Sequence, residues 1–292
     1  MSGFEALVKI VEESPKGVYA VGEMSDGGYV ERQFRPGHGP HNVYSLSKSV
    51  TGCAVGILES EGRLRDTDTV FSYIGDLFPR GYDPAWERVT LRHVMLHRTG
   101  VPAEANIDID SDTQDFRADG HTDFLGYFLS MPIVTEPGEG PFVYCDTNYY
   151  LIGRIVERVT GMKLADFLRE RMFVPMRFRG DAWGDCPNCH TLGGTGLFLR
   201  PRDLCAYGYM LACGGVFEGR RIVPAEWIEK ARGERGEIGY GFHNSADGRW
   251  FFAGGMGGQG LFIFPETRRA LCILGYLTPI EEIEKRLPPL CL

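Results

Sequence analysis

The sequence predicts an α/β (α+β) fold in which both ends of the chain build one antiparallel sheet and the middle forms a helical insertion. Strand-like runs lie at 18–24 and 29–34, separated by the turn signal Asp26-Gly27-Gly28, and again at 250–253, 260–264 and 270–276. From about residue 66 to 175, apolar residues recur at helical spacing with little strand pattern. Strands at both ends with helices between them favour a single sheet that carries an insertion.

Helical patterns account for most of the remaining chain. Runs 4–11 and 278–287 predict N- and C-terminal helices that flank the sheet. Further helices are expected at 45–59, 90–97, 147–159, 164–172, 201–212 and 224–231, with Gly161 as a C-cap and Pro201 and Pro224 in first turns. Residues 239–243 read as one more strand, and the acidic stretch 103–121 reads as an exposed loop.

Composition limits the partners of the protein. The 292 residues carry a net charge of −8 without a dense Lys/Arg run, which argues against nucleic acid or an anionic membrane as a partner. The segment that begins at Met1 lacks the regions of a signal peptide, and no apolar run reaches membrane-spanning length. We therefore expect a cytoplasmic protein that acts on a small molecule.

The eight cysteines do not form the pattern of a disulfide framework. Cys53, Cys205, Cys213 and Cys272 lie in apolar segments and are expected to be reduced and buried. Cys186-Pro187-Asn188-Cys189-His190 matches the form of a c-type haem attachment site, and Cys-x-x-Cys also supplies half of a zinc site. Haem attachment normally needs export, and no clear second ligand pair exists for zinc. A loop with two free thiols is the default interpretation, and no metal or cofactor is expected.

Ser45 and Lys48 open an apolar run with helical character. The i, i+3 spacing places both side chains on one face, one turn apart. A hydroxyl near an amine, at the first turn of a helix where backbone N–H groups are unpaired, is suited to acyl transfer. Ser-x-x-Lys alone is common by chance, so the pair by itself favours a helix start that has incidental polar residues.

Further stretches of the sequence bear on the interpretation of Ser45 and Lys48. Phe142-Val143-Tyr144-Cys145-Asp146-Thr147-Asn148 with the following Tyr149-Tyr150-Leu151-Ile152-Gly153 resembles the second signature of the serine β-lactamase and penicillin-binding-protein superfamily, in its class C and esterase branch. Thr90 to Pro102 resembles the Leu-Arg-His-Leu-Leu-x-His-x-Ser-Gly segment of that branch, and Gly193 to Trp227 resembles its later helical segment. The resemblance runs in the expected order from about Val18 to Tyr276.

This resemblance implies a β-lactamase/transpeptidase-like fold with a sheet domain (1–65 and 191–292), an inserted helical domain (66–190) and an active site in the cleft between them. It also implies that Ser45 is the acylated nucleophile, Lys48 its proton acceptor and Tyr144 a second acid/base. A serine hydroxyl needs a base to become a good nucleophile, and a lysine can act as that base only when its neutral form is accessible.

The third signature departs from the penicillin-recognising pattern. Where those members carry Lys-Thr-Gly or His-x-Gly, this chain has Ala253-Gly254-Gly255, followed by Met256. The glycines allow close approach of a substrate, and the Met256 N–H is expected to complete an oxyanion hole with that of Ser45. Because the cation that would bind a β-lactam carboxylate is missing, we expect weak or absent β-lactamase activity and a preference for uncharged esters or amides.

Asp146 is a second departure, because the family pattern usually has Asn at this position. An amide can donate a hydrogen bond to a substrate carbonyl, whereas an ionised carboxylate cannot. Asp146 is therefore expected either to bind a cationic group of the substrate or to leave more of the base work to Tyr144.

The resulting prediction is a serine hydrolase that forms an acyl-enzyme on an ester or amide, of the esterase, amidase or D-aminopeptidase type. The alternative is a catalytically silent β-lactamase-like protein that binds a ligand or forms oligomers. A metalloenzyme built around Cys186, Cys189 and His190 is a more distant alternative.

Overall fold

The computed structural model describes residues 2–13, 17–36, 39–105, 124–278 and 280–292. Their contacts group into two compact units. The first unit comprises Met1–Ser49, Glu170–Ala182 and Leu197–Leu292, and the second comprises Val50–Arg169 and Trp183–Gly196. The domain boundaries and the cleft expected from the sequence stay a prediction.

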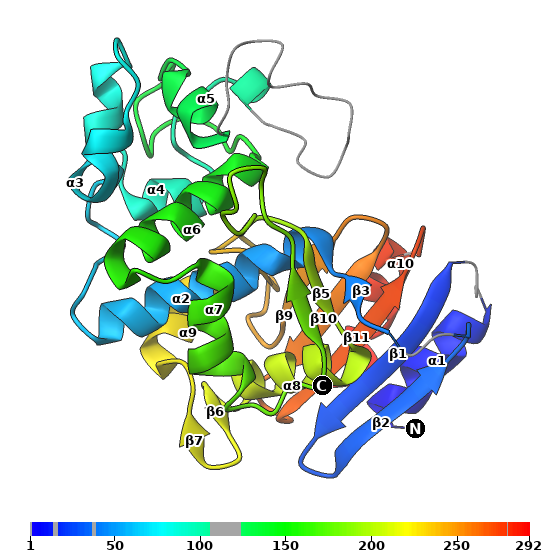
Figure 1. The fold of residues 1–292 in the computed structure, drawn as a ribbon. Helices are drawn as coiled ribbons and strands as arrows, with labels where there is room; N and C mark the ends of the chain where they lie inside the picture. Colours follow the sequence, from blue (N-terminus) through cyan, green and yellow to red (C-terminus); the bar gives the residue numbers. More distant parts are fainter. Residues whose placement is uncertain (1, 14–16, 37–38, 106–123, 279) are drawn as a thin grey trace. The chain divides into compact units, whose positions relative to one another are not determined.

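A six-stranded antiparallel sheet forms the centre of the first unit (Figure 1). Its order is β2-β1-β11-β10-β9-β8. Strand β1 near the start of the chain pairs directly with β11 near its end, which confirms the predicted fold class. The bounds are β1 (Val18–Ser25), β2 (Gly28–Gln33), β8 (His243–Asn244), β9 (Phe251–Gly255), β10 (Gln259–Phe264) and β11 (Arg269–Gly275).

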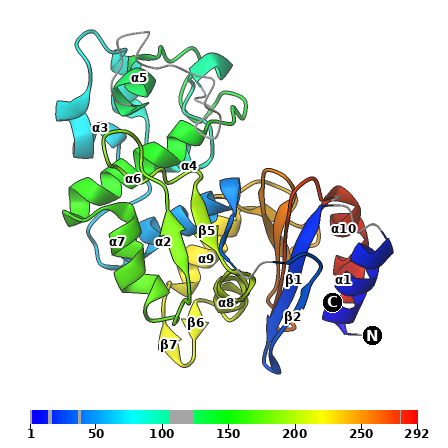
Figure 2. The same ribbon diagram turned by 45° about the vertical axis from the view of Figure 1, so that its right-hand side comes forward.

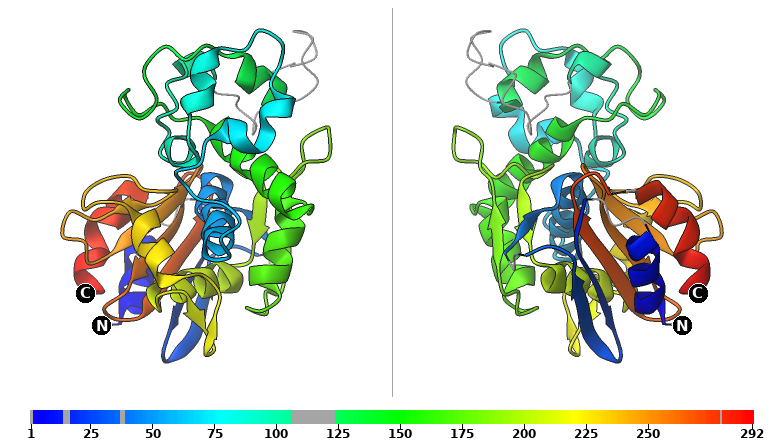
Figure 3. Two further views of the ribbon diagram at one scale, coloured as in Figure 1. Left: turned by 90° about the vertical axis from the view of Figure 1, so that its left-hand side faces the viewer. Right: turned by 90° about the vertical axis from the view of Figure 1, so that its right-hand side faces the viewer.

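Helices cover both faces of this sheet. Helix α8 (Pro201–Ala212) packs on one face, where Gly208 lies so close to Leu261 and Ala270 that an added Cβ would be 2.7 Å from each side chain. Helices α1 (Gly3–Glu13) and α10 (Ile280–Arg286) pack on the other face, as Figure 2 shows. They share an apolar cluster with Leu271 and Ile273 of β11. Figure 3 shows α1 and α10 side by side, with both chain ends next to them.

Several short elements of the first unit carry no sequence pattern that predicts them. Strands β3 (His41–Asn42), β5 (Leu197–Leu199) and β4 (Asp181–Trp183) form a small sheet in the order β3-β5-β4. Strands β6 (Val216–Phe217) and β7 (Arg220–Arg221) form a hairpin, and helix α9 (Ala225–Arg232) follows it. Strands of two or three residues are too short to show an alternating pattern.

The second unit is helical. Its central element is α6 (Asp146–Thr160), which packs against α3 (Val70–Ile74), α4 (Leu91–Met95), α5 (Phe124–Ser130) and α7 (Leu164–Leu168). Helix α2 (Ser47–Ser60) continues into this unit from Val50 onward. Gly161 ends α6 with φ +74°, the left-handed C-cap conformation expected of it.

Some predicted elements are corrected. The run 239–243 is a turn rather than a strand, because Gly241 has φ +81° and strand structure begins only at His243. The helix expected at 164–172 is α-helical only to Leu168 and continues as a π-helical turn, Arg169–Phe173. Pro224 is the N-cap of α9 rather than part of its first turn.

Among the other expectations, most of the loop at 103–121 lies outside the described residues; Ala103–Ala105 forms a short 3₁₀ turn. Every cysteine is a free thiol, but Cys213 is half-buried rather than buried. Within the described ranges, none of the helices combines the length and the apolar character that crossing a membrane requires.

Candidate active site

Ser45 lies on a 3₁₀ turn, Tyr44–Leu46, that leads directly into α2. The predicted nucleophile therefore precedes the α-helix instead of opening it. Lys48 Nζ is 3.1 Å from Ser45 Oγ, within hydrogen-bond distance, as the i, i+3 spacing predicts. Lys48 is 2% exposed. The amine that would accept the serine proton is thus adjacent to the hydroxyl and shielded from water.

Side chains on both sides of Ser45 fix the backbone of this turn. Tyr44 has φ +49°, a left-handed conformation that is costly for a residue with a side chain. Its N–H donates to Asn42 Oδ1 at 2.8 Å, and its carbonyl accepts from Ser47 Oγ at 2.5 Å. The strained residue before the nucleophile is therefore held at both of its peptide groups. Sequence reasoning missed Asn42 and Ser47, since neither belongs to a recognisable signature.

Further polar contacts connect the turn that carries Ser45 to helix α8. Ser49 Oγ donates to the Leu46 carbonyl at 2.8 Å, and Tyr207 of α8 donates its hydroxyl to Ser49 Oγ at 3.1 Å. All three residues are buried. Gly241 approaches from another segment, and a Cβ there would lie 2.6 Å from the Ser49 backbone nitrogen. The turn is consequently packed against helix α8 and the 239–241 loop.

Strand β9 passes beside the same turn. A Cβ on Gly255 would lie 2.2 Å from the Val43 carbonyl oxygen, so a larger residue would force the strand and the turn apart. Gly254 precedes it on β9, and Met256 follows the strand with 55% of its surface exposed. The structure thus places Ser45, Lys48, Gly254, Gly255 and Met256 in one unit. The oxyanion-hole role of the Ser45 and Met256 N–H groups stays a prediction.

Tyr144 belongs to the second unit and lies just before α6. Its side chain is 41% exposed. The hydroxyl donates to Asp146 Oδ1 at 3.2 Å, and the carboxyl-bearing residue is itself buried. The convergence of Tyr144 on Ser45 and Lys48 stays a prediction.

His97 fixes the segment that carries Tyr144. The two rings stack at a centroid distance of 4.9 Å with an interplanar angle of 20°. His97 Nδ1 accepts from the Cys145 N–H at 3.1 Å and lies 3.0 Å from Asn148 Nδ2, while the His97 carbonyl accepts from the Val143 N–H at 2.9 Å. Because a backbone N–H can only donate, Nδ1 of this buried ring carries no proton.

The sequence contained a signal for His97 that was not used. This histidine stands in the stretch from Thr90 to Pro102 that resembles the family segment, although no role was assigned to it. Cys145, between Tyr144 and Asp146, is fully buried, and burial raises the pKa of its thiol. A neutral thiol at this position leaves Asp146 as the acidic group of the segment.

The cysteine loop is held by protein contacts. Cys186 Sγ is 3.3 Å from the Tyr150 hydroxyl, and His190 Nδ1 is 2.6 Å from Glu157 Oε2. Cys189 is exposed. Within the described ranges, no group of three or more His, Cys, Asp or Glu side chains is arranged to hold a metal ion.

Comparison with known proteins identifies the family. The sequence model described as Beta-lactamase matches residues 31–279, so the chain belongs to the Beta-lactamase family. It is 28% identical over 264 residues to 6-aminohexanoate-dimer hydrolase of Paenarthrobacter ureafaciens, covering 80% of this chain and 66% of that protein. It is 32% identical over 141 residues to penicillin-binding protein 4* of Bacillus subtilis (strain 168), covering 45% of this chain and 28% of that protein. The chain thus spans less than two thirds of the length of these curated relatives.

Solved structures confirm the β-lactamase/penicillin-binding-protein-like fold. D-amino acid amidase from Ochrobactrum anthropi SV3, complexed with L-phenylalanine amide, superposes with a TM-score of 0.73 at 18% identity. The superposition covers 99% of this chain and 98% of that chain. At this level of identity the likeness establishes the fold.

Proposed function

We propose that this protein is a serine hydrolase that cleaves small amides or esters through an acyl-enzyme on Ser45. The observation that carries the proposal is the 3.1 Å contact between Ser45 Oγ and the buried Lys48 amine, on a turn that polar contacts hold in place. A hydroxyl and a base in hydrogen-bond contact are the minimum that covalent acyl transfer requires.

In the proposed reaction, neutral Lys48 takes the Ser45 proton while Oγ attacks the substrate carbonyl carbon. The N–H groups of Ser45 and Met256 stabilise the oxyanion of the tetrahedral intermediate. The bond to the leaving group then breaks, and the leaving amine or alkoxide takes a proton from Tyr144. In the second half-reaction water attacks the acyl carbon and gives its proton to the Tyr144 phenolate. The bond between the acyl carbon and Ser45 Oγ then breaks, Lys48 returns its proton to Oγ, and the acid product leaves. This sequence requires Tyr144 to reach the cleft that contains Ser45 and Lys48.

The names of related proteins support an amide as substrate. One relative is a 6-aminohexanoate-dimer hydrolase, and one protein of the same fold is a D-amino acid amidase. The absence of a Lys or His at the position of Ala253 supports weak or absent β-lactam hydrolysis. Asp146 remains a candidate to bind a cationic substrate amine, in competition with its contact to the Tyr144 hydroxyl.

The test is a panel of p-nitrophenyl esters, D- and L-phenylalanine amide, 6-aminohexanoate dimer and nitrocefin, together with fluorophosphonate labelling. We expect turnover of at least one ester or amide, slow or no nitrocefin turnover, and a label that maps to Ser45. Ser45→Ala should abolish both signals. Ser60→Ala is the matched control, because that hydroxyl only donates to the Ile57 carbonyl at the end of α2.

Failure of the wild-type protein to turn over any substrate or to accept the label would favour the catalytically silent alternative. Labelling at a serine other than Ser45 would overturn the assignment of the nucleophile. An Asp146→Asn variant with an unchanged preference between neutral and cationic substrates would remove Asp146 from the substrate site.

A further inference from the structure

A surface pocket in the first unit lies between the edge strand β2 and the beginning of α8. Its volume is about 390 Å³, within the range of small-molecule sites. Alternate residues of β2 line one wall, and two segments of the same unit provide the rest. The lining residues are Tyr29, Glu31, Gln33, Arg179, Arg200, Pro201 and Arg202.

The charge of this pocket is opposite to that of the whole chain. Three guanidinium groups face one carboxylate, in a protein whose net charge is −8. Both oxygens of that carboxylate, on Glu31, accept hydrogen bonds from its neighbours on the strand, Tyr29 and Gln33. A concentration of guanidinium groups in a concave site is typical of phosphate or carboxylate recognition.

Two donors of these arginines lack acceptors. Arg200 Nε and Arg202 Nη1 are buried atoms with no hydrogen-bond acceptor among the described residues. The carboxylate Oδ1 of Asp203 is 3.8 Å from Arg202 Nη1, which is too far for a hydrogen bond. Buried donors of charged groups are normally satisfied by protein, water or an ion, and leaving them unmet is costly. These two buried nitrogens therefore retain unused hydrogen-bonding capacity next to the pocket.

The first turn of α8 adds to the positive potential. Arg200 is its N-cap residue and forms no side-chain cap, and Pro201 follows at the first helical position. The nearby carboxylate of Asp203 instead accepts the N–H groups of Arg179 and Gly180, at 3.0 and 3.1 Å, which fixes the loop that carries Arg179. The N-terminal end of this 12-residue helix attracts anions.

Gly180 makes room for one of these guanidinium groups. A Cβ at this position would lie 2.7 Å from Arg200 Nε. Gly180, which lies between Arg179 and strand β4, therefore leaves space for the Arg200 side chain beside the pocket.

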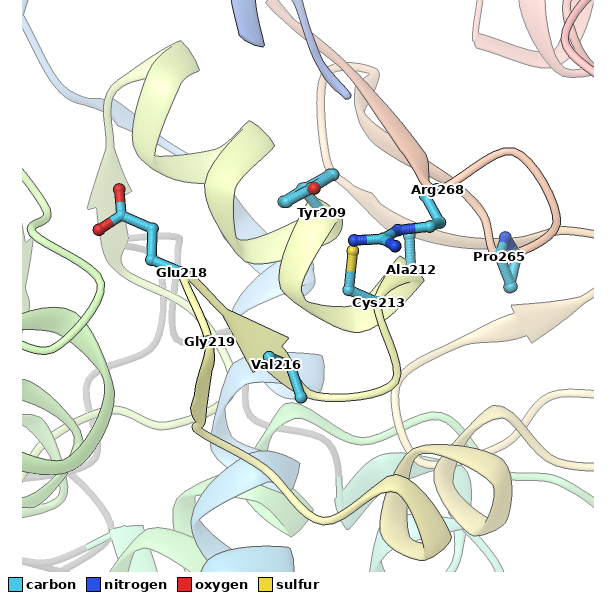
Figure 4. Close-up of a pocket in the computed structure, with 8 residues that line it drawn as sticks. All are labelled: Tyr209, Ala212, Cys213, Val216, Glu218, Gly219, Pro265 and Arg268. Atoms are coloured by element: carbon cyan, nitrogen blue, oxygen red, sulfur yellow. The ribbon is translucent and has the colours of Figure 1, made fainter. Parts of the chain in front are cut away.

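A second pocket of the same unit provides a contrast (Figure 4). It has a volume of about 550 Å³ and is lined by residues at the end of α8, the β6–β7 hairpin and the β10–β11 turn. Its cation, Arg268, points toward Cys213 and is also ion-paired with Asp26 at 3.3 Å, while Glu218 supplies a negative charge. In the second pocket Arg268 is paired with Asp26, whereas the three guanidinium groups of the arginine pocket exceed the two nearby carboxylates, Glu31 and Asp203, by one charge.

We propose that the arginine pocket, defined by Arg179, Arg200 and Arg202 at the start of α8, binds a small phosphate-bearing anion. A phosphate group offers several acceptor oxygens in a tetrahedral arrangement, which suits guanidinium groups that approach from different segments. The site uses none of the residues assigned to acyl transfer, so it does not depend on the proposed function.

The test is calorimetric titration of the full chain with inorganic phosphate and with phenyl phosphate, in a low-salt chloride buffer at pH 7. We expect saturable binding with Kd in the millimolar range or tighter. Arg200→Gln/Arg202→Gln should weaken the binding at least about tenfold. Arg177→Gln is the matched control, because it removes the same charge from an exposed arginine that pairs with Glu218 outside the pocket.

Tighter binding of phenyl phosphate than of phosphate would identify a phosphate ester as the ligand, and the reverse order would identify the free ion. Absence of saturation up to about 10 mM phosphate would overturn the proposal, as would equal affinities of the control and the pocket variant. If the double variant unfolds, Arg179→Gln decides the question, because this exposed side chain can be changed without disturbing the core.

Discussion

The Ser45 turn and the Tyr144 segment are held by different kinds of contact. The serine turn is fixed by hydrogen bonds to its backbone from Asn42, Ser47 and Ser49 and by close backbone packing at Gly255. The tyrosine segment is anchored at its backbone by His97, but the Tyr144 side chain is exposed and rests on a stacked ring. The phenol is thus held by ring stacking and a hydrogen bond to Asp146, whereas the backbone that carries the Ser45 hydroxyl is held by several hydrogen bonds and by close packing.

This difference suggests a division of labour. In the proposed mechanism the nucleophile and its base must keep one geometry through both half-reactions, and a strained, doubly anchored turn provides that geometry. A proton donor to varied leaving groups benefits from rotational freedom. We therefore expect changes near Ser45 to have large effects and changes near Tyr144 to have graded ones.

Loss of the base should have the largest effect. Lys48→Met is expected to lower kcat/KM for an activated ester about 10³-fold, because it removes the amine that lies at hydrogen-bond distance from the serine hydroxyl. Steady-state kinetics measure this directly. Lys163→Met is the control, since that lysine pairs with Asp185 at the surface. A loss of less than about tenfold would show that another group acts as the base.

The packing of β9 against the turn gives the next largest effect. Gly255→Ala places a Cβ 2.2 Å from the Val43 carbonyl, so we expect the free energy of unfolding to fall by about 1–3 kcal/mol and activity to fall about 10²-fold. Chemical denaturation and kinetics test both expectations. Gly126→Ala, where nothing lies within 4 Å of an added Cβ, should be neutral or stabilising. Full activity of Gly255→Ala would mean that the turn tolerates displacement.

The support of Tyr144 should have a moderate effect. His97→Asn, chosen because Asn tolerates the positive φ of 56°, removes the stacked ring and is expected to lower kcat about tenfold with little change in KM. In a Tyr144→Phe background, His97→Asn should lower kcat little further, because both substitutions disable the same function of Tyr144. Additive losses in this double-mutant cycle would assign His97 a role independent of Tyr144.

The smallest effect concerns pH. Burial lowers the pKa of His93, whose Nδ1 accepts from the Thr90 N–H in a capping box of α4. Since the unfolded chain takes up a proton at this residue near pH 6.5 and the folded chain does so only at lower pH, the free energy of unfolding should fall as pH drops below 6.5. His93→Gln keeps an acceptor and should make this decline shallower in urea titrations at pH 7 and 5.5. An unchanged slope would exclude His93 as a contributor.

The elements that the sequence predicted well have local signals. Helix α8 begins at Pro201 and the β1–β2 hairpin turns at Asp26-Gly27, because proline and glycine set backbone angles without distant help. The strand predicted at 239–243 was wrong because its alternating pattern reflects packing by distant segments and not the local backbone conformation. Tyr240 and Phe242 are both buried and imitate strand alternation, but loop packing around Gly241 buries them.

In the candidate site, too, local contacts were predictable from the sequence and contacts between distant segments were not. The Ser45–Lys48 contact was predictable because three residues on one helical turn determine it. The contacts of Asn42 with Tyr44 and of His97 with Tyr144 were not predicted. The first depends on a two-residue strand, and the second joins residues far apart in the chain through ring stacking. Motif resemblance indicated which stretches matter, whereas tertiary packing determines how they are held.

The pairing of β1 with β11 has a consequence for biosynthesis. Ser45 and Lys48 leave the ribosome early, but β9 and β10, which pack beside their turn, follow only about 200 residues later. Until then the first strands have no partner on the β11 side, and such long-range pairing forms late and slowly. A nascent or C-terminally shortened chain should therefore lack the proposed hydrolytic activity, and we expect Ser45 to gain its proposed role only when translation has delivered the final strands.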